Sequence, residues 1–252
     1  MGRCRTAAVG ILGATVWMSA GITNAAEIQV IASGGLKAAY LELVPSFERT
    51  SAHRVSTTWA GSVEIKKRME SGDIFDLVIM PAAFIDELIG LGKVVPGSRA
   101  DLAKSGIGVA VRAGAPRPDI GSGEALRRAL LFAGSIAYST SASGIYLADL
   151  FQRMGIADAL QPKIKQSPPG VPVGEMIARG EAEIGFQQVS ELLPVSGIDY
   201  LGPLPTDIQH FTVFAAGRHI GTREPDAAKA LIDFIKAPAA HPIITKSGME
   251  PA

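Results

Sequence analysis

Apolar and polar residues follow one another along this chain in a pattern typical of alternating strands and helices. The stretch EIQVIA (27–32) alternates and then becomes apolar, which predicts a buried strand. Leu36, Tyr40, Val44 and Phe47 follow at helical spacing. The pattern continues with strands at 54–60 and 75–80 and helices at 62–72 and 82–92. Such alternation predicts a parallel sheet with crossover helices, which is an α/β fold.

A second α/β unit is predicted after a change in composition. The apolar strand at 106–114 leads into APRPDIGSG, where two prolines and two glycines mark a chain crossing. Further strands are predicted at 135–139, 183–188 and 210–217, and helices after Ser122 and at 224–240. We therefore expect two lobes, each a mainly parallel sheet flanked by helices. The predicted lobes are 27–112 together with 218–252, and 113–217.

The first 26 residues have a different pattern. Two arginines precede an uncharged apolar run at 6–22, and small residues follow, with Thr23 and Ala25 in the −3/−1 relation to a cut. This layout predicts a secretory signal peptide at 1–26. The alternative is a membrane anchor, although the length of this apolar run is at the short limit for spanning a bilayer. We expect a periplasmic protein that keeps no membrane anchor and loses its single cysteine, Cys4, with the signal.

Charge and motifs narrow the functional classes. Lys plus Arg and Asp plus Glu both number 24, which gives no reason to expect nucleic acid or an anionic membrane as partner. The four histidines lack metal-ligand spacing, and no phosphate-binding loop or GxSxG elbow is present. We expect no metal and no cofactor.

Four predicted strand ends run into a helix through small polar residues. These turns are ASGGL (32–36), WAGSV (59–63), TSASGIY (140–146) and FQQVSE (186–191). In open α/β sheets ligands bind at the carboxyl ends of strands. Helix N-termini with serine hydroxyls form anion sites without lysine or arginine. Plain helix capping is the alternative for any single turn.

Several stretches resemble the family of periplasmic molybdate-binding proteins. The likeness lies in VIASGGL, in the segment from FERTSAHRV to DLVIMP, in ASGIYLADLFQRMGI and in ARGEAEIGFQQVSELL, and covers nearly all of 27–250. It implies a two-lobed solute-binding protein of the type II periplasmic fold. Such a protein closes on a small anion between its lobes and delivers it to the membrane subunits of an ATP-driven (ABC) importer.

The resemblance also implies a changed ligand site. The family holds its oxyanion with serine hydroxyls and backbone N–H groups of the first two turns, and with backbone N–H groups and a tyrosine hydroxyl of the second lobe. In this chain Gly35 occupies the position of the family's first-turn serine, with Ser33 close by. Ser62 occupies the position of the second-turn serine, and Gln188 that of the tyrosine. Amides such as those of Gln187 and Gln188 suit a planar carboxylate as well as an oxyanion.

A second resemblance raises an enzymatic alternative. GFQQVSELLPV, together with SGG in the first turn, is similar to a subgroup that includes exported aconitate isomerases, which move a proton across an allylic tricarboxylate. Such an enzyme needs a general base within hydrogen-bond reach of the substrate. The candidates are Tyr146, Glu64 and Ser143.

The sequence thus favours a monomeric, exported binder of a small anion, with a carboxylate favoured over a molybdate-like oxyanion, and with an aconitate isomerase-like enzyme as the alternative. The candidate ligand-binding residues are Ser33, Gly34, Gly35, Gly61, Ser62, Ser141, Ser143, Gly144, Gln187 and Gln188.

Overall fold

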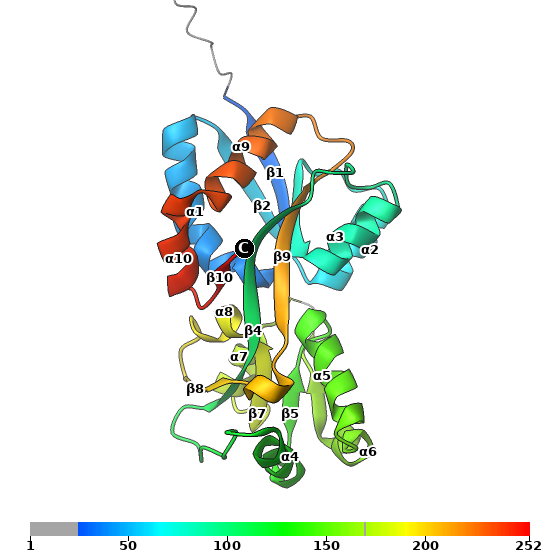
Figure 1. The fold of residues 1–252 in the computed structure, drawn as a ribbon, viewed down its shortest axis with the longest axis vertical. Helices are drawn as coiled ribbons and strands as arrows, with labels where there is room; N and C mark the ends of the chain where they lie inside the picture. The colour runs from blue at the N-terminus through cyan, green and yellow to red at the C-terminus, as the bar shows by residue number, and fades with distance from the viewer. Residues whose placement is uncertain (1–24, 169) are drawn as a thin grey trace, which may run out of the picture.

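Two lobes, each with strands covered by helices, are stacked along the long axis of the protein (Figure 1). The computed structural model describes residues 25–168 and 170–252. Within these residues one continuous sheet serves both lobes, with strand order β2-β1-β3-β9-β4-β7-β5-β6, and β8 and β10 also pair with β4. The predicted signal peptide lies outside the described residues except for its last two positions.

The first lobe contains the N-terminal strands and the C-terminal helices. Its strands are β1 (Glu27–Ala32), β2 (Arg54–Trp59), β3 (Leu77–Pro81), β9 (Phe211–Arg218), β10 (Glu250–Pro251) and the start of β4 (Ala100–Arg112). Its helices are α1 (Lys37–Ser51), α2 (Ser62–Glu70), α3 (Ala82–Gly90), α9 (Pro225–Lys236) and α10 (His241–Lys246), with short 3-10 helices η1 (Gly34–Leu36) and η4 (Pro238–Ala240). Helices α1 and α9 pack on one face of the sheet, where Phe47 and Phe234 meet edge to face.

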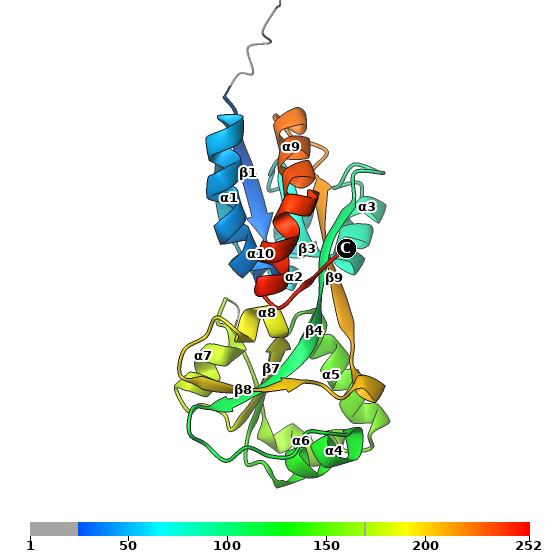
Figure 2. The ribbon, with the colours of Figure 1, turned by 60° about the vertical axis from the view of Figure 1, so that its left-hand side comes forward.

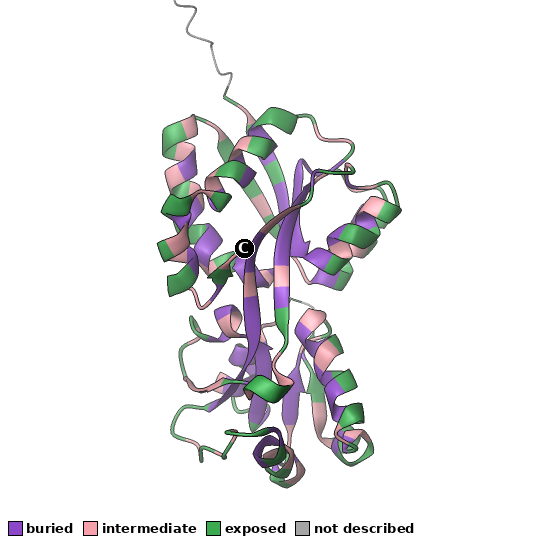
Figure 3. Cartoon of the chain, in the orientation of Figure 1, coloured by how far each residue is buried: buried purple, intermediate pink, exposed green. Residues whose placement is uncertain are grey.

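The second lobe is built around the remainder of β4. Its strands are β5 (Ile136–Tyr138), β6 (Ile164–Gln166), β7 (Ile184–Gln188) and β8 (Ile198–Pro203). Its helices are α4 (Gly123–Phe132), α5 (Ala142–Arg153), α6 (Ala157–Leu160), α7 (Val173–Ala178) and α8 (Val189–Leu192), with η2 (Gln161–Lys163) and η3 (Thr206–Ile208). Strands β4, β5 and β7 are buried, whereas the helices expose their outer faces (Figure 3).

Strand directions bring the carboxyl ends of both lobes together. Strands β1 and β3 are parallel, and β3 and β4 are both antiparallel to β9, so β1, β3 and β4 share one direction. Strands β5 and β7 are parallel to each other, and β7 is antiparallel to β4. Since β4 runs from the first lobe into the second, β1 and β3 point toward the second lobe and β5 and β7 toward the first (Figures 1 and 2).

The predicted two-lobed α/β fold is confirmed, with local additions. Ser122 caps α4 as expected, its hydroxyl accepting from the Ala125 N–H at 3.1 Å. The segment at 198–203, for which no element was predicted, is a strand. Strand β4 pairs with β9 up to Gly106 and with β7 from Ile107, so it belongs to both lobes. The exact residues at which the lobes divide stay a prediction. No helix of the described residues has the length and apolar character needed to span a bilayer.

Buried Asp76 ties the first strand to the returning C-terminal helix. Its carboxylate accepts hydrogen bonds from the Gln29 N–H (2.8 Å), the Thr222 hydroxyl (2.8 Å) and the N–H groups of Arg223 (2.9 Å) and Glu224 (3.2 Å). Burial would raise the pKa of Asp76, but these four hydrogen bonds outweigh it and lower the pKa. The ionised form therefore stabilises the fold.

We predict that Asp76→Asn lowers the free energy of unfolding by about 2–4 kcal/mol at pH 7, because an amide cannot accept all four hydrogen bonds. A carboxylate with a lowered pKa contributes its stability above the unfolded-state value of roughly 3.9 and loses it as the pH falls through the folded-state value. The difference between wild type and variant should therefore shrink below about pH 4. Urea unfolding across pH measures it.

Asp73→Asn is the matched control, because Asp73 pairs with Arg68 at the surface and such pairs contribute about 0–1 kcal/mol. An equal loss of stability in both variants would contradict the role given to Asp76.

Candidate functional site

The four small polar turns lie where the two lobes face each other. The turns after β1 and β2 end strands of the first lobe, and those after β5 and β7 end strands of the second. Helix α8, which follows β7, contacts η1 and α1 across the boundary (Figure 2). The structure therefore brings the predicted ligand-binding turns together between the lobes.

The first turn contributes a buried hydroxyl and a glycine that cannot be replaced freely. Ser33 is 4% exposed, and its Oγ makes no hydrogen bond to any described residue. A Cβ at Gly35 would overlap the ring of Phe214 on β9. The aromatic ring thus fills the space that a serine side chain would need at this position.

The second turn faces open space. Gly61 precedes α2 as its N-cap, and a Cβ added there would meet nothing within 4 Å. Ser62, the first residue of α2, is buried. Glu64 lies on the first turn of the same helix and is exposed.

The third turn holds more hydroxyls than its helix uses. Ser141 is the N-cap of α5 but makes no side-chain capping bond, and its Oγ lies 3.0 Å from that of Ser139. Ser143 is fully buried, and its Oγ has no partner among the described residues. Gly144 is required because a Cβ there would collide with the Ser139 carbonyl. Capping therefore does not account for Ser143.

Tyr146 on α5 is engaged away from these hydroxyls. Its OH donates to the Ile208 carbonyl at 2.8 Å, and its ring stacks on His210 with 4.5 Å between centroids. Ring and hydroxyl both serve to hold α5 against η3 and the start of β9.

Gln188 ends β7 as a buried amide with one free atom. Its Nε2 donates to the Thr212 hydroxyl at 2.9 Å, and its Oε1 has no partner among the described residues. A half-turn of the amide would let the Thr212 hydroxyl donate to the oxygen and would turn the NH2 group to the free side. Gln188 thus offers either an acceptor or a donor at the lobe boundary.

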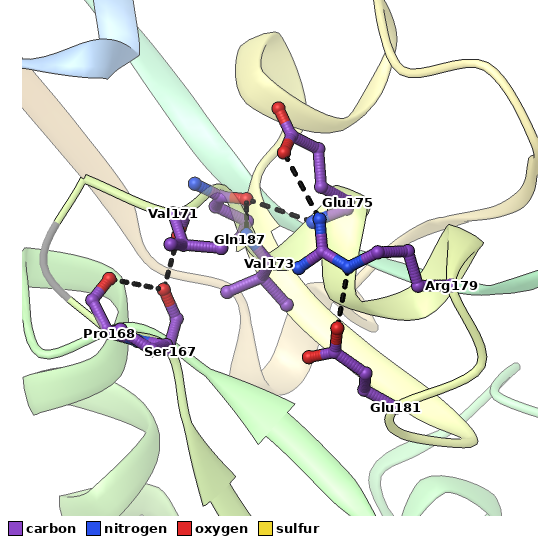
Figure 4. A network of polar contacts seen from close by, with 9 residues as sticks. Ser167, Pro168, Val171, Val173, Glu175, Arg179, Glu181 and Gln187 are labelled. Carbon is purple, nitrogen blue, oxygen red and sulfur yellow. Dashed lines mark hydrogen bonds and ion pairs between the residues drawn. The ribbon is translucent and has the colours of Figure 1, made fainter.

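Gln187 is oriented by the start of α7. Its Oε1 accepts from the Val173 N–H at 2.9 Å and the Gly174 N–H at 3.4 Å (Figure 4). The amide nitrogen therefore points the other way, and the Gln187 side chain acts to lower the pKa of the Glu191 carboxyl group.

Glu191 is a residue of this boundary that sequence reasoning missed. A Cβ at Gly34, in the first lobe, would collide with its Oε1. Burial raises the pKa of Glu191 to about 7, which outweighs the lowering by hydrogen bonds from the Gln187 side chain and the Gln188 backbone N–H. The available signal was an acidic residue three positions after the strand end in FQQVSE.

Ser190 links the two lobes directly. Its Oγ donates to the Gly35 carbonyl at 2.7 Å and also lies 3.4 Å from the Ser105 Oγ on β4. Only protein atoms take part in this contact.

Three buried polar atoms at the predicted site thus lack partners within residues 25–168 and 170–252: Ser33 Oγ, Ser143 Oγ and Gln188 Oε1. A buried polar atom without a hydrogen bond costs about 1–3 kcal/mol, so such atoms need an explanation. Here they come from both lobes and share the boundary with a titratable carboxyl. This arrangement suits a small polar ligand that bonds to each lobe. In the part of the chain that is described, no three His, Cys, Asp or Glu side chains gather as metal ligands would.

Comparison with known proteins identifies the family. A family model described as bacterial extracellular solute-binding protein matches residues 28–250. The chain belongs to this family. The resemblance inferred from the sequence is thereby confirmed.

The proteins similar to this chain include an enzyme and molybdate-binding proteins. An aconitate isomerase from Pseudomonas sp is 37% identical over 230 residues, covering 89% of this chain and 87% of the relative. The molybdate-binding protein ModA of Azotobacter vinelandii is 26% identical over 234 residues, covering 89% and 90%. The solved molybdate-binding protein of Azotobacter vinelandii superposes with a TM-score of 0.74 at 20% identity, covering 88% of this chain and 98% of that one, which shows the shared fold.

We predict that Gly35→Ser lowers the free energy of unfolding by roughly 1–3 kcal/mol, because the new side chain overlaps Phe214. The cost should be smaller in a Phe214→Leu background, since the two positions share the same space. Thermal unfolding of the single and double variants measures it.

Gly61→Ser makes the same chemical change in a turn with open space, so its stability should stay within about 0.5 kcal/mol of wild type. A Gly35→Ser protein as stable as Gly61→Ser would refute the steric explanation.

Proposed function

We propose that the cleft between the lobes binds a small polycarboxylate and that the protein interconverts trans- and cis-aconitate by moving an allylic proton. The observation that carries this proposal is the set of unpaired Ser33, Ser143 and Gln188 atoms beside the ionisable Glu191. Neutral donors from both lobes suit carboxylates, and a proton shift needs a titratable group within reach.

Two features of the cleft favour a carboxylate over a tetrahedral oxyanion. Phe214 occupies the space of a hydroxyl at Gly35, and an amide stands at Gln188, where the molybdate-binding family has a tyrosine hydroxyl. Two neutral hydrogen bonds, worth about 0.5–1.5 kcal/mol each, are lost or replaced. Together they cost on the order of a hundredfold in affinity. The aconitate isomerase relative is also more similar to this chain than the molybdate-binding relative is.

The mechanism begins with closure of the lobes. Serine hydroxyls and helix N-termini of the two lobes hold different carboxylates of one ligand, so the ligand favours the closed arrangement by its contacts in both lobes. An allylic shift moves one proton and one double bond without any change of oxidation state. We place the protein in the periplasm, exported by residues 1–26.

A second candidate is a binding protein that delivers a carboxylate or oxyanion to the membrane subunits of an ABC importer. It is favoured by membership of the solute-binding family and by relatives named for molybdate binding. Such a protein binds its ligand without converting it, so turnover separates the two functions.

We predict that the purified protein converts trans-aconitate to cis-aconitate, and the reverse, as followed by proton NMR or chromatography. Calorimetry with both aconitates, citrate, sulfate, tungstate and molybdate should give its tightest binding with a tricarboxylate. Nanomolar binding of molybdate without any isomerisation would favour the transport function instead.

A further prediction concerns the unpaired serines. Ser143→Ala and Ser33→Ala should weaken tricarboxylate binding by roughly 1.5–3 kcal/mol, since each removes a hydrogen bond to a charged group. Because neither hydroxyl has a partner in the described part of the chain, stability should not fall. Calorimetry and thermal unfolding on the same samples measure both effects.

Ser122→Ala is the control with the opposite pattern. Its hydroxyl caps α4, so the change should cost about 1 kcal/mol of stability and leave binding unaltered. Unchanged affinity in both cleft variants would exclude the serines from the ligand site.

A further inference from the structure

Glu191 has a position that is unusual for a carboxylate at the start of a short helix. Its carboxyl group lies against Gly34 of the opposite lobe, and the Gln187 side chain and the Gln188 backbone N–H act to lower its pKa. Gln188 is at the same time one of the residues with an unpaired buried atom. The carboxyl group is therefore located where the predicted ligand-binding residues of both lobes meet.

Helix capping is the alternative explanation for this carboxyl group. Gln188 is the N-cap of α8 and Glu191 its third residue, and a glutamate at that place bonding back to the N-cap N–H is half of a capping box. Capping, however, works at the solvent-exposed surface and requires no burial. Glu175 stands at the same third position of α7 and is exposed. A cap alone does not explain why the Glu191 side chain is half-buried between the lobes.

The surroundings of Glu191 fix the direction of its carboxyl group. The Gln187 oxygen accepts from two N–H groups of α7 (Figure 4), so its amide nitrogen is directed away from them, and the Gln187 side chain acts on the pKa of Glu191. Gly34 has no side chain, which leaves room for the carboxyl group at the boundary. A general base is effective when a second group fixes its orientation, and Gln187 is placed to do this for Glu191.

We propose that the Glu191 carboxylate is the base that carries the allylic proton, an assignment that rests on the proposed isomerase function. Glu191 removes a proton from the methylene carbon of the bound tricarboxylate, and the C–H electron pair becomes part of the delocalised allyl system. The protonated Glu191 then returns the proton to the other end of that system. The double bond has moved by one position, and Glu191 is again a carboxylate.

The other candidate bases are less suited to this role. The Tyr146 hydroxyl already donates to the Ile208 carbonyl, and Glu64 is exposed on α2. Ser143 has a free hydroxyl, but no described side chain accepts its proton to activate it. Glu191 combines a location in the cleft with a pKa of about 7, close to the pH at which a base is most effective.

The test is Glu191→Gln, because glutamine preserves a capping bond but cannot accept the proton. We expect kcat for trans-aconitate to fall at least a hundredfold, which is the usual contribution of a general base. The Kd for trans-aconitate should stay the same or become tighter, since a negative charge beside an anion is removed. The melting temperature should stay the same or rise, since a desolvated carboxylate is removed.

Glu175→Gln is the matched control, because it makes the same change at the equivalent position of α7, and its kcat should match wild type. In the wild type, kcat/KM in both directions should rise with pH through about 7 to a plateau, because the base must be deprotonated. Glu191→Asp keeps a carboxylate and should retain part of the activity.

Each outcome distinguishes the two levels of the proposal. A wild-type protein that isomerises neither aconitate removes the proposed function itself. A wild type that does isomerise, with Glu191→Gln keeping more than a tenth of its kcat, overturns the assignment of Glu191 alone. Should Glu191→Gln fail to fold, a wild-type kcat/KM without any inflection between pH 6 and pH 8 overturns it as well.

Discussion

Two neighbouring strands, β4 and β9, determine where everything else in this protein can lie. Strand β4 passes from the first lobe into the second, and β9, which runs antiparallel to it, returns the chain to the first lobe. Because every other strand pairs in register with one of them or with a neighbour, the strands of both lobes are forced to end at the same level. Four helix N-termini and their polar turns therefore meet at one boundary, although they are spread over most of the sequence.

The polar turns were predictable because their chemistry is local. Ser33, Ser143 and Gln188 each follow a recognisable strand and precede a helix, and glycine next to serine at such a junction can be read from a few residues. The α/β fold followed from the same alternation. The short β8, β10 and α6 were not predicted, since their lengths of two to six residues carry too little periodicity.

The properties of Glu191 and Gly35 depend on residues far away in the sequence, which no local pattern reveals. Glu191 is ordinary in FQQVSE, and only the approach of Gly34 from the other lobe desolvates it. Likewise, the absence of a side chain at Gly35 has its reason in Phe214 on β9. In both cases the sheet order decides which distant residue packs against the turn.

The hydrogen bond from Ser190 to the Gly35 carbonyl contains no ligand atom, so it lowers the energy of the joined lobes by the same amount whether or not the cleft is filled. For a transport receptor this is a disadvantage, because the membrane subunits must tell a loaded receptor from an empty one by its shape. For an enzyme the contact does not affect which ligand binds, but it affects the rate of product release. The contact has to break before a product leaves, so its strength limits the turnover number.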